Sequence, residues 1–451
     1  MTASTENHSD PSALPNLKPR RFREILGDRQ ILSWALFDWG NSAFATTVMA
    51  GFFPIFFKQY WSNTGPTTEN TVTAVQSTAL LGYANSFSSL ILGLSAPLLG
   101  ALADRAKGRK RFLFGFTFLG AVSASALALV GQGQWGLAAA FYILASVGFW
   151  GGQNFYDALL ALVSRKSEMD HVSGLGYGLG YLGGGLLFAV NVFMTLKPEF
   201  FGLSSAAEAV RISFLMVGIW WLLFTIPLML NVKEEKNSET NLPFSRLTRE
   251  AFAQVKHTFR SLKNHKPAFT FLIGYFFYID GVNTIIKMAV DYGMSLGFKS
   301  DSLIVALLMV QFIGFPAAIG FGFLSQKIGA KHSLFVAIGI YALVTVLATQ
   351  LRVEWHFYAL AASIGLVQGG IQALSRSVFG RLIPGEHAGE FFGFFNMLGR
   401  FSSILGPLLI AITGLVSESS RLAMLSLLIL FAVGAWMLSK VQFPEGTPES
   451  K

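Results

Sequence analysis

Charged and amide side chains occur inside stretches of the sequence that are otherwise apolar. In WALFDWGNS, residues 34–42, the side chains of Asp38, Asn41 and Ser42 are three and four residues apart and therefore share one face of a helix. An ionised side chain near the centre of a bilayer costs about 2.5–3.5 kcal/mol even on a lenient insertion scale, so such residues are usually functional. The pattern predicts that this face binds a charged group or carries a proton.

A second apolar stretch repeats this pattern over a longer distance. Asp280, Asn283, Thr284, Lys287 and Asp291 are spaced so that they lie on one face of a helix. Asp280 and Lys287 are two turns apart, about 10.5 Å along the axis, which is too far for a direct ion pair. Each therefore needs another partner, which is either a substrate or proton or a charge on a neighbouring helix.

The remaining candidates lie in other apolar stretches. Arg400 is close to the middle of its stretch, and a guanidinium group suits a carboxylate or a phosphate. We expect Arg400 and Lys287 to hold an anionic group, and Asp38 and Asp280 to face an amine or to carry a coupling proton. A zwitterion such as an amino acid would match both signs, whereas ion pairs between helices are the structural alternative. Further candidates for substrate or proton handling are Asn41, Asp157, Asn283, Gln368, Gln372 and Asn396.

The composition predicts that these stretches cross a membrane. The chain has 451 residues, of which 52% are hydrophobic and 13% charged, compared with about 25% charged residues in an ordinary soluble domain. Twelve apolar segments are long enough to span a bilayer, which needs about 20 residues each. We predict spans near residues 31–57, 77–101, 111–130, 136–162, 173–196, 211–232, 268–290, 302–324, 332–350, 355–378, 390–415 and 421–440.

The basic residues predict the orientation of these spans. Of the 34 lysines and arginines, 26 fall in segments on the same side as the N-terminus, and six fall on the opposite side. Because positively charged loops stay in the cytoplasm, both termini are predicted to be cytoplasmic. The net charge of +9 is therefore explained by topology, and no nucleic-acid partner is expected.

A long polar segment divides the spans six and six. It contains a basic stretch with apolar residues at helical spacing, which predicts an amphipathic helix on the membrane surface. The two halves also share short motifs in the same order, and parallel repeats usually place a binding site at their interface. The predicted divisions are an N-terminal tail (1–29), a first six-helix bundle (30–232), a linker (233–267), a second six-helix bundle (268–440) and a C-terminal tail (441–451).

Three motifs resemble a known family. GALADRAKGRK, residues 100–110, is similar to the loop 2–3 signature of the major facilitator superfamily, with one extra residue. WALFDWGNSAFATTVMAGFFPIFF and GGIQALSRSVFGRLIPGEHAGEFFGFFNMLGRFSSILGP resemble the bacterial "unknown major facilitator" branch, which is related to fungal autophagy-linked vacuolar amino-acid exporters. The resemblance implies an all-α membrane protein with twelve transmembrane helices in two pseudo-symmetric bundles. It also implies a monomer in a bacterial inner membrane that works by alternating access.

The resemblance further implies a gating latch at the cytoplasmic ends of the spans. In the superfamily the signature aspartate joins the ends of spans 2, 4 and 11, and a carboxylate near a helix start is stabilised by about 0.3–1 kcal/mol. The alternative is that this basic cluster sets only the topology. The expected latch residues are Gly100, Asp104, Arg105, Gly108 and Arg109.

Other functional classes lack the residues that they need. The sequence has no cysteine, no P-loop and no His-Glu-x-x-His pair, so no metal, cofactor or enzymatic site is expected. The glycines Gly176, Gly180 and Gly184 form a ridge that predicts close packing of helices. We predict a secondary active transporter for a small polar or zwitterionic solute such as an amino acid, with export as the direction that the resemblance implies. The alternatives are a flippase for lipids or amphiphiles and a non-transporting membrane sensor.

Overall fold

The computed structural model describes most of the chain. Residues 1–19 and 444–451 of the predicted tails, and most of the predicted linker with its amphipathic helix, lie outside the described residues. The described residues are 20–62, 90–91, 93–104, 108–234, 253, 255, 265–295, 300–402, 404–417 and 420–443.

Helices make up the regular structure of this described part. A helical stretch at residues 93–104 precedes α5. The other helices of the first half are α1 (Phe22–Gly27), α2 (Arg29–Ala43), η1 (Phe44–Phe52), α3 (Phe53–Phe56), η2 (Phe57–Trp61), α5 (Arg109–Ala126), η3 (Leu127–Leu129), α6 (Trp135–Val163), α7 (Met169–Leu196), η4 (Pro198–Phe201) and α8 (Ala206–Asn231). Those of the second half are α10 (Lys266–Ser295), α11 (Ser300–Ile328), α12 (Ala330–Ala348), α13 (Glu354–Leu382), η5 (Gly385–His387), α14 (Ala388–Phe401), α15 (Leu405–Ser417), α16 (Ser420–Leu425) and α17 (Leu427–Ser439).

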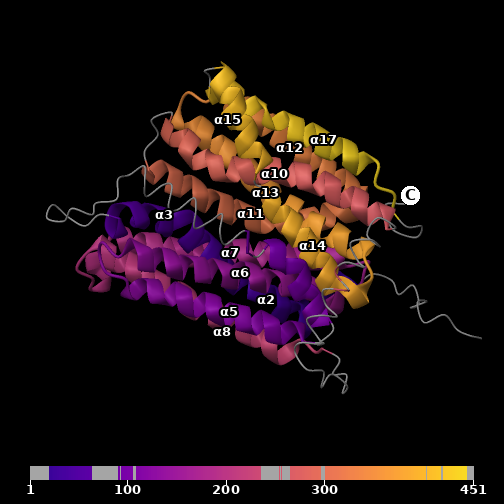
Figure 1. The fold of residues 1–451 in the computed structure, drawn as a ribbon, viewed down its shortest axis with the longest axis horizontal. Helices are drawn as coiled ribbons and strands as arrows, with labels where there is room; N and C mark the ends of the chain where they lie inside the picture. Colours follow the sequence, from indigo (N-terminus) through magenta and orange to yellow (C-terminus); the bar gives the residue numbers. More distant parts are fainter. Residues whose placement is uncertain are drawn as a thin grey trace, which may run out of the picture.

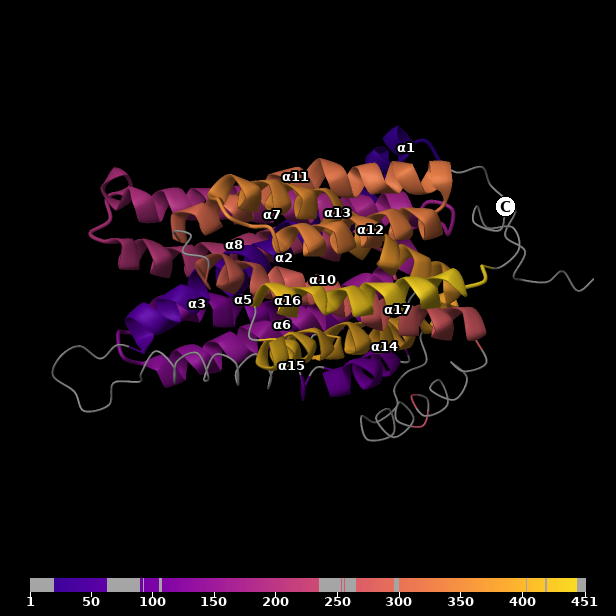
Figure 2. The same cartoon turned by 90° about the horizontal axis from the view of Figure 1, so that it is seen from above.

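The helices of each half pack together, and the two halves lie against each other. Figure 1 shows the first half in indigo to magenta and the second half in orange to yellow. Helix α7 of the first half and helix α11 of the second half lie where the two halves meet. Helix α7 contacts both α11 and α13, and α6 contacts α14. In the view from above, the long helices run side by side in a similar direction (Figure 2). The boundary between the halves is therefore formed mainly by α6, α7, α11, α13 and α14.

Ten helical segments among the described residues are long and apolar enough to cross a membrane. The apolar helix 423–439 is shorter, and most of the span predicted at 77–101 lies outside the described residues. The all-helical membrane fold is thus confirmed, whereas the count of twelve spans and the orientation stay predictions. We call the end of the molecule where α2 begins and α6 and α13 end the predicted cytoplasmic end.

One face of α8 carries large apolar side chains that are exposed on the surface of the protein. Leu215, Ile219, Leu223, Ile226 and Leu230 follow one another at helical spacing, and each is more than 40% exposed. A stripe of this size would be unfavourable in water but is matched by lipid chains. The backbone polar groups of such a span are satisfied within its own helix, which is the condition for crossing a bilayer.

The predicted glycine ridge packs α7 closely against α2 and α6. A Cβ atom on Gly180 would lie 2.6 Å from Oγ of Ser42, and one on Gly176 would lie 2.8 Å from the Tyr156 hydroxyl. A Cβ atom on Gly184 would lie 3.0 Å from the carbonyl oxygen of Ser42. A side chain at any of these positions would force the neighbouring groups to move. The ridge therefore brings the polar face of α2 into the boundary between the halves.

The span predicted over 390–415 consists of two helices in succession. Helix α14 ends at Phe401, and α15 begins at Leu405. The backbone N–H groups of Leu405 and Gly406 donate hydrogen bonds of 3.0 and 2.9 Å to the carboxylate of Asp280 on α10. Asp280 therefore satisfies two of the N–H groups that have no partner within α15.

Candidate functional site

Arg376 on α13 is the centre of the candidate site, and its side chain is fully buried. Its Nε donates to the Ser173 hydroxyl at 2.9 Å, and its Nη2 donates to the Ser173 carbonyl oxygen at 3.1 Å. The rings of Trp34, Tyr156 and Tyr177 lie around the guanidinium, with centroids 5.0, 5.3 and 4.3 Å from Cζ. Hydrogen bonds and aromatic faces thus fix a cation in a site that excludes water.

Two carboxylates share this one guanidinium. Nη1 of Arg376 lies 3.1 Å from Oδ1 of Asp157 on α6 and 3.9 Å from Oδ2 of Asp38 on α2. The Tyr156 hydroxyl donates to Oδ2 of Asp38 at 3.2 Å. With all three groups ionised, they carry a net charge of −1, which is unfavourable in a medium of low polarity. Arg400 is a further cation that interacts electrostatically with Asp157. The arrangement can therefore accept a proton or a cationic group of a substrate.

Amide side chains extend the cluster across three helices. Asn41 donates to Gln153 at 3.1 Å, and Gln153 donates to Asp157 at 3.0 Å. Asn396 on α14 donates to Asp157 at 3.1 Å and to Asn154 at 3.3 Å. Asp157 of the first half thus accepts hydrogen bonds from α13 and α14 of the second half. Any movement that separates the halves must break these contacts.

Arg400 lies in the last turn of α14, just before the break in this span. Its Nη2 donates to the carbonyl oxygen of Trp150 at 3.0 Å, and its Cζ lies 4.9 Å from the centroid of the Trp150 ring. Among the described residues, its Nε and Nη1 atoms are buried and have no hydrogen-bond partner. A guanidinium with unused buried donors is suited to binding a carboxylate or another oxyanion.

The other residues predicted for substrate handling have different surroundings. Nδ2 of Asn283 donates a long hydrogen bond of 3.4 Å to the Gly399 carbonyl oxygen. Asn283 therefore lies at the break between α14 and α15. Gln372 accepts a long hydrogen bond of 3.5 Å from the Tyr181 hydroxyl, and Gln368 is half-buried one turn earlier on α13. Lys287 belongs to α10, but its side chain lies outside the described part of the structure.

The carboxylate of Asp280 has the contacts of a helix cap. In addition to the two N–H groups of α15, it accepts a hydrogen bond of 3.2 Å from the Thr284 hydroxyl. The approach is so close that a Cβ atom on Gly406 would overlap Thr284. These contacts favour a structural role for Asp280, and its role in substrate or proton handling stays a prediction.

The predicted latch residues join the halves at the predicted cytoplasmic end. Asp104 accepts hydrogen bonds from the N–H groups of Gly389 and Glu390 at 3.2 and 3.0 Å, at the first turn of α14. Arg109 donates to Asp104 at 2.7 Å and reaches the Glu386 carbonyl oxygen at 3.3 Å. The carboxylate thus meets the positive end of a helix dipole.

Two glycines of the signature also have defined positions. Gly100 touches the backbone of Gly389 so closely that no Cβ atom would fit. Gly108 is the N-cap residue of α5, directly before Arg109. Arg105 lies outside the described residues.

Comparison with known proteins shows the family of this chain. A family model described as "Vacuole effluxer Atg22 like" matches residues 27–451. The chain belongs to this family. It is 39% identical over 420 residues to the MFS-type transporter YxiO of Bacillus subtilis, covering 93% of this chain and 96% of YxiO. It is 22% identical over 448 residues to autophagy-related protein 22 of Eremothecium gossypii, covering 87% and 86% of the two chains.

Solved structures show the fold of this Atg22-like chain. The human organic anion transporter MFSD10 (TETRAN) matches with a TM-score of 0.68 at 15% identity, covering 93% of this chain and 100% of MFSD10. The proton:xylose symporter XylE matches with a TM-score of 0.66 at 16% identity, covering 95% and 97%. The major facilitator fold is therefore confirmed, and the relatives are multi-pass membrane transporters and not enzymes.

The sequence patterns miss the central residue of the site in this Atg22-like chain. The charge count groups Arg376 with the cytoplasmic loop after the tenth span, because it is close to the predicted end of that span. The structure instead buries it six residues before the end of α13. Its position within an apolar stretch, between Ser375 and Ser377, is the signal that could have identified it.

Asp170 and Arg381 are also missed. Nη1 of Arg381 on α13 lies 2.8 Å from Oδ2 of Asp170 on α7, and Ser377 donates to the same carboxylate. The Ser173 hydroxyl donates to the Ala373 carbonyl oxygen at 2.7 Å. These contacts add a second connection between the halves at the predicted cytoplasmic end, beside the latch at Asp104.

Proposed function

We propose that this chain is a secondary active transporter that moves a small solute carrying a carboxylate, such as an amino acid, by alternating access. The observation that carries the proposal is the pair of buried, unused donors on Arg400 among the described residues. A protein that kept these donors without a ligand would lose the hydrogen bonds that they make with water. A substrate carboxylate would accept a charge-assisted hydrogen bond from one of these donors in place of water.

Asp38 carries the coupling proton in this proposal. Asp157 accepts hydrogen bonds from Arg376, Gln153 and Asn396, so its charge is stabilised by nearby donors. Asp38 has a longer ion pair of 3.9 Å with Arg376, so it is the carboxylate with weaker compensation. Protonation of Asp38 would leave the cluster neutral, whereas its ionisation would leave one excess negative charge.

The contacts between the halves support an alternating mechanism. At the predicted cytoplasmic end, α14 is joined to Asp104, and α13 is joined to Asp170 and Ser173. Such discrete polar contacts can be broken and remade as one rigid body moves against another. The conformation described is then the one in which this end is closed, and an exported substrate would leave from the other side.

The relatives and the distribution of charge support a location for the protein and a direction of transport. The relatives include a bacterial MFS-type transporter and fungal autophagy-related proteins, and the family description names an effluxer. We infer a plasma-membrane transporter that works as a monomer and exports its substrate. The excess of lysines and arginines on the side of the N-terminus, 26 against six, supports a cytoplasmic location for the tails.

Efflux from proteoliposomes tests the proposal. Vesicles containing the protein would be loaded with amino acids, short peptides, small organic anions and neutral sugars, and the release of each would be followed by mass spectrometry. We expect selective release of solutes that carry a carboxylate, with a rate that depends on an imposed pH gradient. Release of sugars alone would contradict the proposal, and movement of labelled lipid without solute release would favour a flippase.

A further inference from the structure

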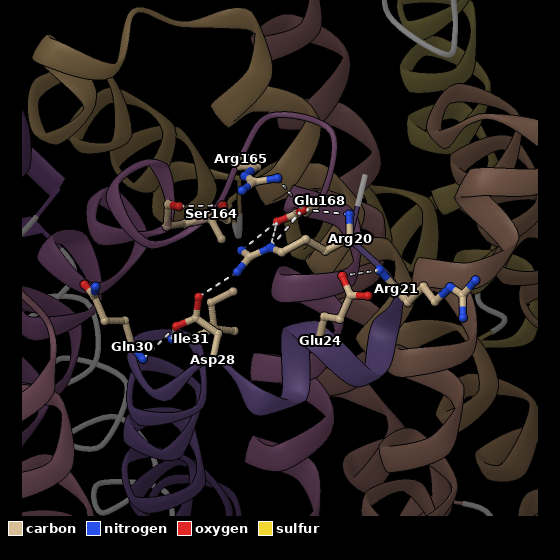
Figure 3. Close-up of polar contacts among 10 residues, drawn as sticks. Arg20, Arg21, Glu24, Asp28, Gln30, Ile31, Ser164, Arg165 and Glu168 are labelled. Carbon is tan, nitrogen blue, oxygen red and sulfur yellow. Dashed lines mark hydrogen bonds and ion pairs between the residues drawn. The ribbon is translucent and has the colours of Figure 1, made fainter. Parts of the chain in front are cut away.

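The segment before the first span is fixed to the turn between α6 and α7. Nε of Arg20 lies 3.1 Å from each carboxylate oxygen of Glu168, and Nη2 lies 2.8 Å from Oε2 (Figure 3). The backbone N–H of Arg20 donates to the same carboxylate at 2.9 Å. Nη1 of Arg20 also contacts Asp28 at 2.7 Å, and Asp28 caps α2 through Gln30 and Ile31. Arg20 thus connects the segment before α1 to the N-cap residues of α2 and α7.

Charge strengthens these contacts. The Glu168 side chain is only 1% exposed, and burial alone would raise the pKa of its carboxyl group. The hydrogen bonds and charge of Arg20 outweigh burial and hold the pKa of Glu168 below its usual value. A charge-assisted, bidentate arrangement of this kind is stronger and more specific than a single surface ion pair.

The short helix that follows Arg20 contacts both halves of the molecule. The ring of Phe22 on α1 packs edge-on against His171 of α7, with centroids 5.6 Å apart. The same ring packs against Phe323 of α11, with centroids 4.9 Å apart. Ile25 is fully buried, and Ile319 of α11 packs against the same hydrophobic cluster. Because α7 and α11 belong to different halves, α1 crosses their boundary at the predicted cytoplasmic end.

We propose that residues 20–28 act as a clasp that stabilises the closed state of this end. The pairing of Arg20 with Glu168 holds α1 on the first half, and so positions Phe22 for contact with Phe323 of the second half. When the halves separate at this end, α1 stays with the first half and loses its contacts with α11. This inference rests on the alternating access in the proposed function, and it assigns a role to the N-terminal segment that is separate from the latch at Asp104.

The distance between the halves can be measured directly, because the natural chain has no cysteine. Lys166 in the α6–α7 turn and Lys327 at the end of α11 are both exposed. Spin labels on Lys166→Cys and Lys327→Cys would report this distance by double electron–electron resonance in nanodiscs. We expect one dominant short distance, and we expect Arg20→Gln or Glu168→Gln to raise the ratio of the longer to the shorter population about threefold.

Three further variants separate the clasp from a general loss of stability. The double variant Arg20→Gln/Glu168→Gln should match Arg20→Gln, since this single change already removes the pairing with Glu168 together with the contact to Asp28. Phe22→Ala should give a similar shift while leaving the ion pair in place. Arg23→Gln, a change at an exposed arginine of the same helix, should leave the distances unchanged.

One outcome of these distance measurements would contradict the proposed clasp. Unchanged distance distributions in Arg20→Gln, Glu168→Gln and Phe22→Ala proteins that elute as folded monomers would overturn it. The measurement needs no substrate, so the clasp and the substrate assignment can fail independently.

Discussion

Arg376 on α13 and Asp157 on α6 join the two halves of the chain, with Nη1 and Oδ1 3.1 Å apart. Both side chains are buried where the spans of the two halves meet. A buried ion pair adds little to stability when compared with apolar packing, but losing one partner costs about 3–5 kcal/mol. A transporter that opens at this boundary must therefore supply another partner for each of these two charges.

The central guanidinium should not tolerate a conservative change. Arg376→Lys keeps the charge but removes the forked contacts with Ser173 and Asp157. We expect the transport rate to fall by about tenfold or more while the protein remains folded. Initial rates of solute release from proteoliposomes would check this, with Arg352→Lys at an exposed position as the control. Equal rates for Arg376→Lys and wild type would contradict the assignment.

The protonation of Asp38 should matter for coupling and not for binding. Asp38→Asn mimics the protonated carboxyl group, so exchange of labelled solute across the membrane should continue near the wild-type rate. Accumulation driven by a pH gradient should be lost, because no proton is released in the cycle. Loss of both activities would instead indicate that the Asp38 carboxylate binds an amino group of the substrate.

The negative charge of Asp104 at the first turn of α14 should stabilise the closed state. Asp104→Asn keeps the shape of the side chain but removes the charge that faces the first turn of α14. We expect the closed state to lose about 0.3–1 kcal/mol, which is up to about a fivefold change in the ratio of the two states. The labelled Lys166→Cys/Lys327→Cys pair would report this change, and an unchanged ratio would mean that the basic cluster sets only the topology.

Asp280 should affect stability more than transport. Asp280→Ala removes the carboxylate that caps α15, and loss of an N-cap costs about 0.5–2 kcal/mol. Thermal unfolding in detergent should therefore occur at a lower temperature, whereas the transport rate per folded molecule should stay close to wild type. A transport defect without a change in thermal stability would restore the sequence prediction that Asp280 handles substrate or protons.

Local patterns identify several of the polar residues that the structure brings together. Asp38, Asn41, Asp157 and Asn396 were identified because a polar side chain in an apolar span is unfavourable without a partner, and the structure brings these residues into one network. Hydropathy likewise predicted the helical membrane fold, because each span satisfies its own backbone.

What the sequence could not show depends on contacts between distant residues. Arg376 lies near the predicted end of a span, where a basic residue usually marks the cytoplasmic side, so its charge was attributed to topology. The capping role of Asp280 depends on N–H groups 125 and 126 positions away in the chain. The interruption after Phe401 was marked only by the small residues and proline of the sequence that follows it.

The most direct test of the account is the selectivity of Arg400 for a carboxylate. Release of a transported amino acid from proteoliposomes would be compared with release of its amide, which lacks the negative charge, for wild type and Arg400→Ala. We predict that wild type prefers the carboxylate by about tenfold or more and that Arg400→Ala brings the two rates close together. The same preference in Arg400→Ala as in wild type would contradict the proposed anion site.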